Sequence, residues 1–132
     1  MKRFELEAQK DPRFTNWCRD FAYSTFGEGH QLVLQRLHSF VVMNIKYVPD
    51  AYNETITAPG LILQTRRGDC DDMSLFIKAV CHYLRIPAQY VLLGKKPNEF
   101  THIVVEACGI IIDGANRLFN DVPQYYQYRK TA

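Results

Sequence analysis

A cysteine, a histidine and an aspartate are spaced along this chain in a way that could support acyl transfer. Cys70 stands in the segment Arg67-Gly68-Asp69-Cys70-Asp71-Asp72, directly before a strongly periodic apolar stretch, and His102 and Asp113 follow on two strand-like segments. A thiol at a helix N-terminus lies where backbone N–H groups and the helix dipole favour a thiolate. A thiolate, an imidazole and a carboxylate that orients the imidazole are the working groups of a cysteine acyl-transfer enzyme.

Each of the three residues also has an ordinary structural interpretation. Cys70 could be a structural thiol, although its neighbours are polar and the apolar stripe begins only at Met73. His102 could be a polar residue on a half-exposed strand. Asp113 precedes Gly114 and could simply form a turn. A zinc site made of the same three residues is chemically conceivable, but it would lack a fourth protein ligand.

The elements that must position these residues divide into helices followed by strands. Residues 1–29 predict one or two short helices, and apolar spacings of three and four predict a helix from about 30 to 47, with a short helical turn at 61–64. The clearest helix follows Cys70 and ends before Ile86-Pro87. Its apolar stripe consists of Met73, Phe76, Ile77, Val80, Cys81 and Leu84.

The second half of the chain changes to a strand-like pattern. Residues 88–93, 101–107 and 110–113 predict three strands with hairpin-length connections, the last through a tight turn at Gly109. Helices first and strands second predict an α+β fold, with a small antiparallel sheet that packs on the Cys70 helix.

Length, charge and cysteine content limit the classes of protein. The 132 residues predict a single domain over 1–132, with a core at about 30–120 and a tyrosine-rich tail at 121–132 that could pack on the body or bind a partner. The net charge of +2 gives no reason to expect nucleic-acid binding. The absence of a long apolar run or a signal-peptide pattern predicts a cytoplasmic protein outside the membrane, with virion association left open. The four cysteines form no CxxC pair, and Cys18, Cys81 and Cys108 are interpreted as small buried residues.

From about Ile45 to Asp113 the chain resembles the transglutaminase-like family of the papain-like cysteine enzymes. The resemblance lies in Ile45-Lys46-Tyr47, the turn at Pro59, the segment 67–72, Leu84-Arg85-Ile86-Pro87-Ala88, Thr101-His102-Ile103-Val104-Val105 and the strand that ends at Asp113. It implies a papain-like core with the nucleophile at the start of the central helix. It further implies that Cys70 is the nucleophile, His102 the general base and acid, and Asp113 the orienter.

Three further groups near Cys70 have two interpretations each. The Cys70 backbone N–H is the natural first donor of an oxyanion hole, and Gln64 could be a second donor or a solvated loop residue. Asp69, Asp71 and Asp72 are better explained as helix caps and dipole partners than as metal ligands, so we expect no metal. Arg66 and Arg67 could contact an anionic substrate or be a solvated pair.

We therefore expect thiol-dependent acyl transfer on amide or isopeptide bonds, with hydrolysis favoured and no cofactor required. The expected partner is a protein or peptide substrate, with a peptidoglycan peptide as one option. Transglutaminase cross-linking is the first alternative. The second is a non-catalytic assembly or binding module of a phage or bacterial particle.

Overall fold

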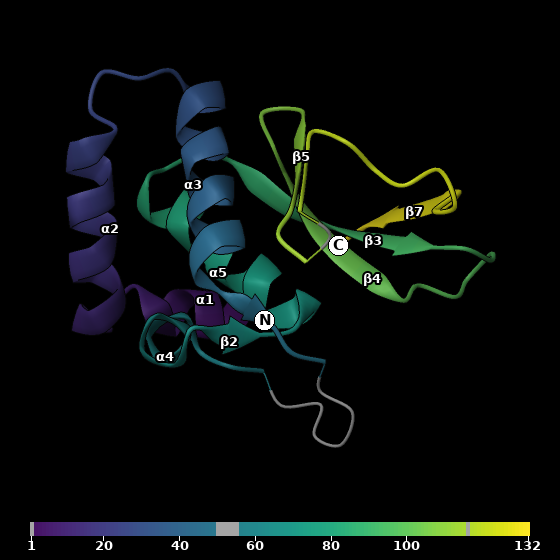
Figure 1. Ribbon diagram of the computed structural model, residues 1–132, viewed down its shortest axis with the longest axis horizontal. Helices are drawn as coiled ribbons and strands as arrows, with labels where there is room; N and C mark the ends of the chain where they lie inside the picture. The colour runs from purple at the N-terminus through teal and green to yellow at the C-terminus, as the bar shows by residue number, and fades with distance from the viewer. Residues whose placement is uncertain (1, 50–55, 116) are drawn as a thin grey trace.

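The computed structural model describes residues 2–49, 56–115 and 117–132, and its helices lie beside a five-stranded sheet (Figure 1). The helices are α1 (Lys2–Ala8), α2 (Pro12–Ser24), α3 (His30–Asn44), α4 (Pro59–Thr65) and α5 (Cys70–Tyr83). The strands are β1 (Lys46–Tyr47), β2 (Arg67–Gly68), β3 (Ala88–Gly94), β4 (His102–Ala107), β5 (Ile110–Asp113), β6 (Leu118–Phe119) and β7 (Tyr128–Thr131). The predicted α+β class and the helix that follows Cys70 are confirmed.

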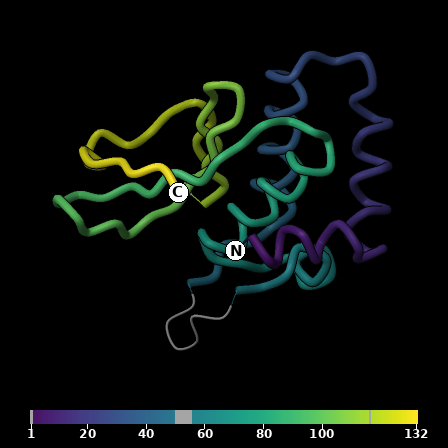
Figure 2. The backbone as a smooth tube through the Cα atoms, turned by 180° about the vertical axis from the view of Figure 1, so that it is seen from behind, coloured from purple at the N-terminus to yellow at the C-terminus, as the bar shows by residue number. Residues whose placement is uncertain are grey.

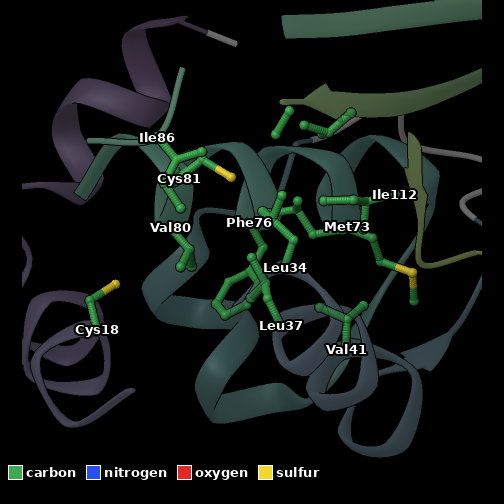
Figure 3. Packing of buried hydrophobic residues seen from close by; sticks show 14 of the residues in the cluster. Cys18, Leu34, Leu37, Val41, Met73, Phe76, Val80, Cys81, Ile86 and Ile112 are labelled. Atoms are coloured by element: carbon green, nitrogen blue, oxygen red, sulfur yellow. The ribbon is translucent and has the colours of Figure 1, made fainter. Parts of the chain in front are cut away.

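Helix α5 is the centre of the fold, because it contacts α1, α3 and α4 as well as β3 and β4. Its predicted apolar stripe is buried, apart from the half-buried Leu84. Figure 3 shows part of the resulting core, in which Leu34, Leu37 and Val41 of α3 gather with Met73 and Phe76 of α5 and Ile112 of β5. Helix α5 therefore lies between the other helices and the sheet, which cover its apolar side chains.

The five-stranded sheet has the order β6-β5-β4-β3-β7, and every neighbouring pair is antiparallel. The β4–β5 hairpin turns at Cys108 and Gly109, whose φ angles of 53° and 74° suit a two-residue turn between right-twisted strands. The tight turn predicted at Gly109 is thus confirmed. Cys108 was expected to be buried, but it is exposed, because the turn lifts it away from the core.

The C-terminal tail packs on the sheet, and it supplies an edge strand that its sequence did not predict. Strand β7 pairs with β3, so that Val91 lies opposite Thr131. Figure 2 shows this yellow segment running beside the β3–β4 hairpin. Val122 and Tyr126 of the tail contact a second apolar cluster, formed by Val91, Leu93, Val104 and Ile111. The tail therefore supplies the cover that these four residues need against water.

The predicted helix from about 30 to 47 is too long by its last residues. Helix α3 ends at Asn44, and Lys46–Tyr47 form a short strand parallel to Arg67–Gly68. The N–H of Lys46 donates to the Arg66 carbonyl (2.8 Å), and the N–H of Val48 donates to the Gly68 carbonyl (2.9 Å). Carbonyls that precede α5 thereby gain partners that are distant in sequence, which a local apolar pattern cannot reveal.

The N-terminal helix is fastened to α5 through a largely buried ion pair. Lys78 Nζ of α5 lies 2.8 Å from Glu5 Oε2 of α1, and His82 Nδ1 lies 3.1 Å from Glu5 Oε1.

No helix within the described ranges is long and apolar enough to cross a membrane.

Candidate active site

The segment around Cys70 is built as a helix start. Cys70 is the first residue of α5, and Asp69 is its N-cap. The Asp69 carboxylate accepts a hydrogen bond from the Asp72 N–H (3.0 Å), and the Asp72 carboxylate accepts one from the Asp69 N–H (3.1 Å), which completes a capping box. Asp72 also accepts from the Thr57 N–H (2.6 Å), and burial raises the pKa of Asp72 to about 6. A Cβ on Gly68 would lie only 2.8 Å from the Asp72 Cβ, so glycine lets the strand meet the helix. The predicted cap at Asp69 is confirmed.

The fold brings Cys70, His102 and Asp113 together. His102 Nε2 lies 2.7 Å from Asp113 Oδ2, and His102 also hydrogen-bonds Cys70. Because Nε2 faces the carboxylate, Nδ1 is the ring nitrogen left for the thiol. The second oxygen of Asp113 accepts a hydrogen bond from the Ala115 N–H (3.1 Å), which fixes the carboxylate.

The environment of His102 favours its protonated form. Burial by itself lowers the pKa of His102, but the hydrogen bonds and negative charge of Asp113 and Cys70 outweigh that effect and raise it to about 9. Asp113 is only 1% exposed and His102 8% exposed, so water screens their attraction little. The site therefore places a proton-bearing imidazole next to Cys70.

A second contact fixes the distance between α5 and β4. The Ser74 hydroxyl donates to the Ile103 carbonyl (3.0 Å), and both groups are buried. Ser74 lies one helical turn after Cys70, and Ile103 follows His102 directly, so this hydrogen bond couples the elements that carry the thiol and the imidazole.

His38 of α3 supports the strand end that carries Asp113. Its Nε2 donates to the Asp113 carbonyl (3.1 Å), and its ring lies 5.6 Å from that of Phe119. Burial lowers the pKa of His38, which keeps the ring neutral with the proton on Nε2. Sequence reasoning did not assign His38 to the site. The available signal was its position between Leu37 and Val41, on the apolar face of the helix.

Tyr126 covers one face of the His102 imidazole. The two ring centroids lie 5.5 Å apart with an interplanar angle of 15°, and Tyr125 packs against Tyr126 at 4.6 Å. The tail therefore forms one wall around the histidine, in addition to its role in the sheet.

Gln64 lies on α4, and its side chain is engaged with another helix. Its Oε1 accepts a hydrogen bond from Arg13 Nη1 of α2 (2.8 Å), and the pair is exposed. An oxyanion role for Gln64 stays a prediction. Among the described residues, no group of three or more His, Cys, Asp and Glu side chains could hold a metal ion.

In a papain-like cysteine-enzyme core, a thiol at the N-terminus of a central helix is hydrogen-bonded to a histidine on an antiparallel sheet, and Cys70 and His102 have this arrangement. The chain belongs to the transglutaminase-like superfamily, whose family model matches residues 19–116. No curated protein matches the chain in sequence.

Several solved structures share the fold. A candidate cysteine protease from Cytophaga hutchinsonii is 25% identical, with a TM-score of 0.59 over 78% of this chain and 38% of that protein. Legionella pneumophila LapG is 17% identical, with a TM-score of 0.64 over 89% of this chain and 74% of LapG. A candidate protease from Parabacteroides distasonis is 11% identical, with a TM-score of 0.62 over 84% of this chain and 24% of that protein. The chain thus spans well under half of the Cytophaga and Parabacteroides proteins.

Proposed function

We propose that this chain is a cysteine peptidase or amidase that cleaves amide or isopeptide bonds through Cys70, His102 and Asp113. The observation that carries the proposal is the hydrogen-bonded series from Cys70 through His102 to Asp113, with a histidine that retains its proton. Membership of the transglutaminase-like superfamily supports the same chemistry. The likeness to candidate proteases favours water over an amine as the acceptor.

In the proposed reaction, the Cys70 thiolate attacks the carbonyl carbon and forms a tetrahedral intermediate. His102 gives its Nδ1 proton to the leaving amine, the C–N bond breaks and a thioester remains. His102, now neutral, takes a proton from water as the water attacks the thioester. The C–S bond then breaks, which releases a carboxylic acid and restores the thiolate with the imidazolium.

The remaining groups have supporting roles in this proposal. Asp113 holds His102 in the tautomer and orientation that present Nδ1 to the thiol. The backbone N–H of Cys70, in the first turn of α5, is the proposed oxyanion donor, since such N–H groups have no acceptor inside their helix.

The first test is alkylation of each cysteine by iodoacetamide at about pH 5.5, followed by mass spectrometry. An ordinary thiol with a pKa near 8.5 is only about 0.1% ionised at this pH. An imidazolium-paired thiolate is ionised to a far greater extent, but it is a weaker nucleophile, so we expect it to react about tenfold faster overall. An accessible free thiol, glutathione, is the comparison, because Cys108 is exposed but its Sγ lies 3.4 Å from His30 Nδ1. His102→Gln should abolish the advantage of Cys70, whereas the variant His82→Gln should preserve it. Labelling of Cys70 no faster than glutathione in the native protein would overturn the proposed ion pair.

The second test separates hydrolysis from the alternatives. A peptide library is incubated with the native protein in water enriched in ¹⁸O, with and without a primary amine. Hydrolysis places ¹⁸O in new carboxyl groups, while cross-linking yields amine adducts without cleavage. If Cys70→Ala retained full biological function, the chain would act as an assembly or binding module instead.

A further inference from the structure

A cavity beside the proposed triad is lined by an excess of positive charge. It has a volume of about 590 Å³ and lies between the end of α3, the β1–β2 pair and the turn after β5. Four cationic side chains line it: Lys46, Arg66, Arg67 and Arg117. None of the described residues that line it is acidic, although the charges of Asp69 and Asp71 act on its lining residue Tyr47. We call it the basic cavity.

The four cations of the basic cavity differ from other surface cations in their pairing. None of them forms an ion pair with a residue in the described ranges, although other surface cations such as Arg36 do so. Arg66 is partly engaged, since its Nε donates to the Leu63 carbonyl (2.8 Å) and its guanidinium lies 5.2 Å from the Phe40 ring centroid. Like charges that surround one hollow without ion-pair partners create a positive potential that concentrates anions.

The basic cavity adjoins the proposed active site through the chain itself. Its lining residue Gly114 follows Asp113 directly, and its lining residue Met73 lies on α5 one turn after Cys70. Tyr47 lines it too, and on β1 it lies opposite Gly68 of β2, two residues before Cys70. A group in the cavity and a carbonyl at Cys70 can therefore belong to one substrate.

We propose that the basic cavity binds a carboxylate of the substrate, so that the bond cleaved at Cys70 lies near an acidic side chain or a free peptide C-terminus. This inference rests on the proposed function. Arginine suits the role, because its planar guanidinium pairs with both oxygens of a carboxylate. Lys46 comes from β1, Arg67 from β2 and Arg117 from the turn before β6, so the charges approach the ligand from several elements.

The test compares the alkylation of Cys70 by anionic iodoacetate and by neutral iodoacetamide, expressed as a ratio of rate constants. The variant Arg67→Gln, Arg117→Gln removes two charges from the basic cavity. The control Arg19→Gln, Arg85→Gln removes two exposed charges from α2 and from beyond the far end of α5. Two unit charges at about 10 Å in water of low ionic strength change the ratio by roughly threefold. We expect that fall in the cavity variant only, and we expect it to shrink at about 0.3 M salt.

An unchanged ratio in the cavity variant, or an equal fall in the control, would overturn the proposal. Circular dichroism verifies that each variant folds. Lys46→Gln, Arg117→Gln serves as a second cavity variant if Arg67 proves necessary for β2. Each ratio is divided by the rate constant for neutral iodoacetamide, so the intrinsic reactivity of Cys70 cancels. If His102→Gln left the iodoacetamide rate of Cys70 unchanged, the proposed function would be refuted separately.

A peptide library with free or amidated C-termini identifies the source of the carboxylate. Enrichment of Asp and Glu beside the cleaved bond in both libraries indicates an acidic side chain. Cleavage at a fixed distance from free C-termini alone indicates a terminal carboxylate. Cleavage by the native protein with neither preference would overturn the proposal while leaving the proposed hydrolysis intact.

Discussion

Replacing Asp113 by asparagine removes the charge that holds the proton on His102, while it keeps the size of the side chain. The pKa of His102 rises from its ordinary 6.5 to about 9, and this difference corresponds to about 3 kcal/mol in favour of the imidazolium. Burial opposes that rise, and a single adjacent opposite charge typically shifts a pKa by about 1 to 3 units. We therefore expect the pKa of His102 to fall to between about 6 and 8 in Asp113→Asn.

Histidine NMR titration measures this pKa directly. The chain has four histidines, and His102→Gln assigns the relevant signal. The matched variant Asp20→Asn removes an exposed carboxylate and should leave the His102 titration unchanged. A pKa that stays near 9 in Asp113→Asn would refute the argument that the carboxylate holds the proton.

The same change should alter the pH dependence of stability. A folded-state pKa of about 9 means that the native protein binds this proton more tightly than the unfolded chain does. The resulting stabilisation is fully present below about pH 6.5 and is lost as the pH rises through about 9. Urea denaturation at pH 6 and pH 9.5 should show a larger loss for the native protein than for Asp113→Asn, by at least about 1 kcal/mol.

Three further substitutions test the supports of the site and fold. Ser74→Ala leaves a buried carbonyl of β4 without its donor and should lower the free energy of unfolding by about 1–2 kcal/mol in urea denaturation, whereas an unchanged midpoint would show that the contact contributes nothing. Gly68→Ala places a Cβ 2.8 Å from a side-chain carbon of α5 and should lower the melting temperature more than Gly29→Ala, where a Cβ meets nothing within 4 Å; equal effects would contradict the steric argument. Glu5→Leu leaves the largely buried Lys78 ammonium unpaired and should cost about 3–5 kcal/mol in thermal denaturation, and the added change Lys78→Leu should recover most of that loss if the pair is the cause.

Short-range sequence patterns were sufficient to predict several elements of the fold. The stripe from Met73 to Leu84 predicted a helix, because spacings of three and four place these side chains on one helical face, although the structure also buries Leu75 and Ala79 outside that stripe. The helix cap at Asp69 and the tight turn at Gly109 could also be predicted from sequence, since each depends on residues only a few positions apart. The order of these elements predicted the α+β class, and the segment around Cys70 predicted a nucleophile at a helix start.

Only the tertiary structure decided which distant groups meet. The pairing of β1 with β2, the edge strand β7 and the Tyr126 ring on His102 all join segments whose local patterns carry no information about one another. The sequence places His38 on an apolar helix face, but its hydrogen bond to the Asp113 carbonyl forms only when α3 packs against β5. The sequence supplies side-chain types and local periodicity. Long-range hydrogen bonds, and the cluster of cations that lines the basic cavity, join residues that are distant in sequence and therefore exist only in the folded chain.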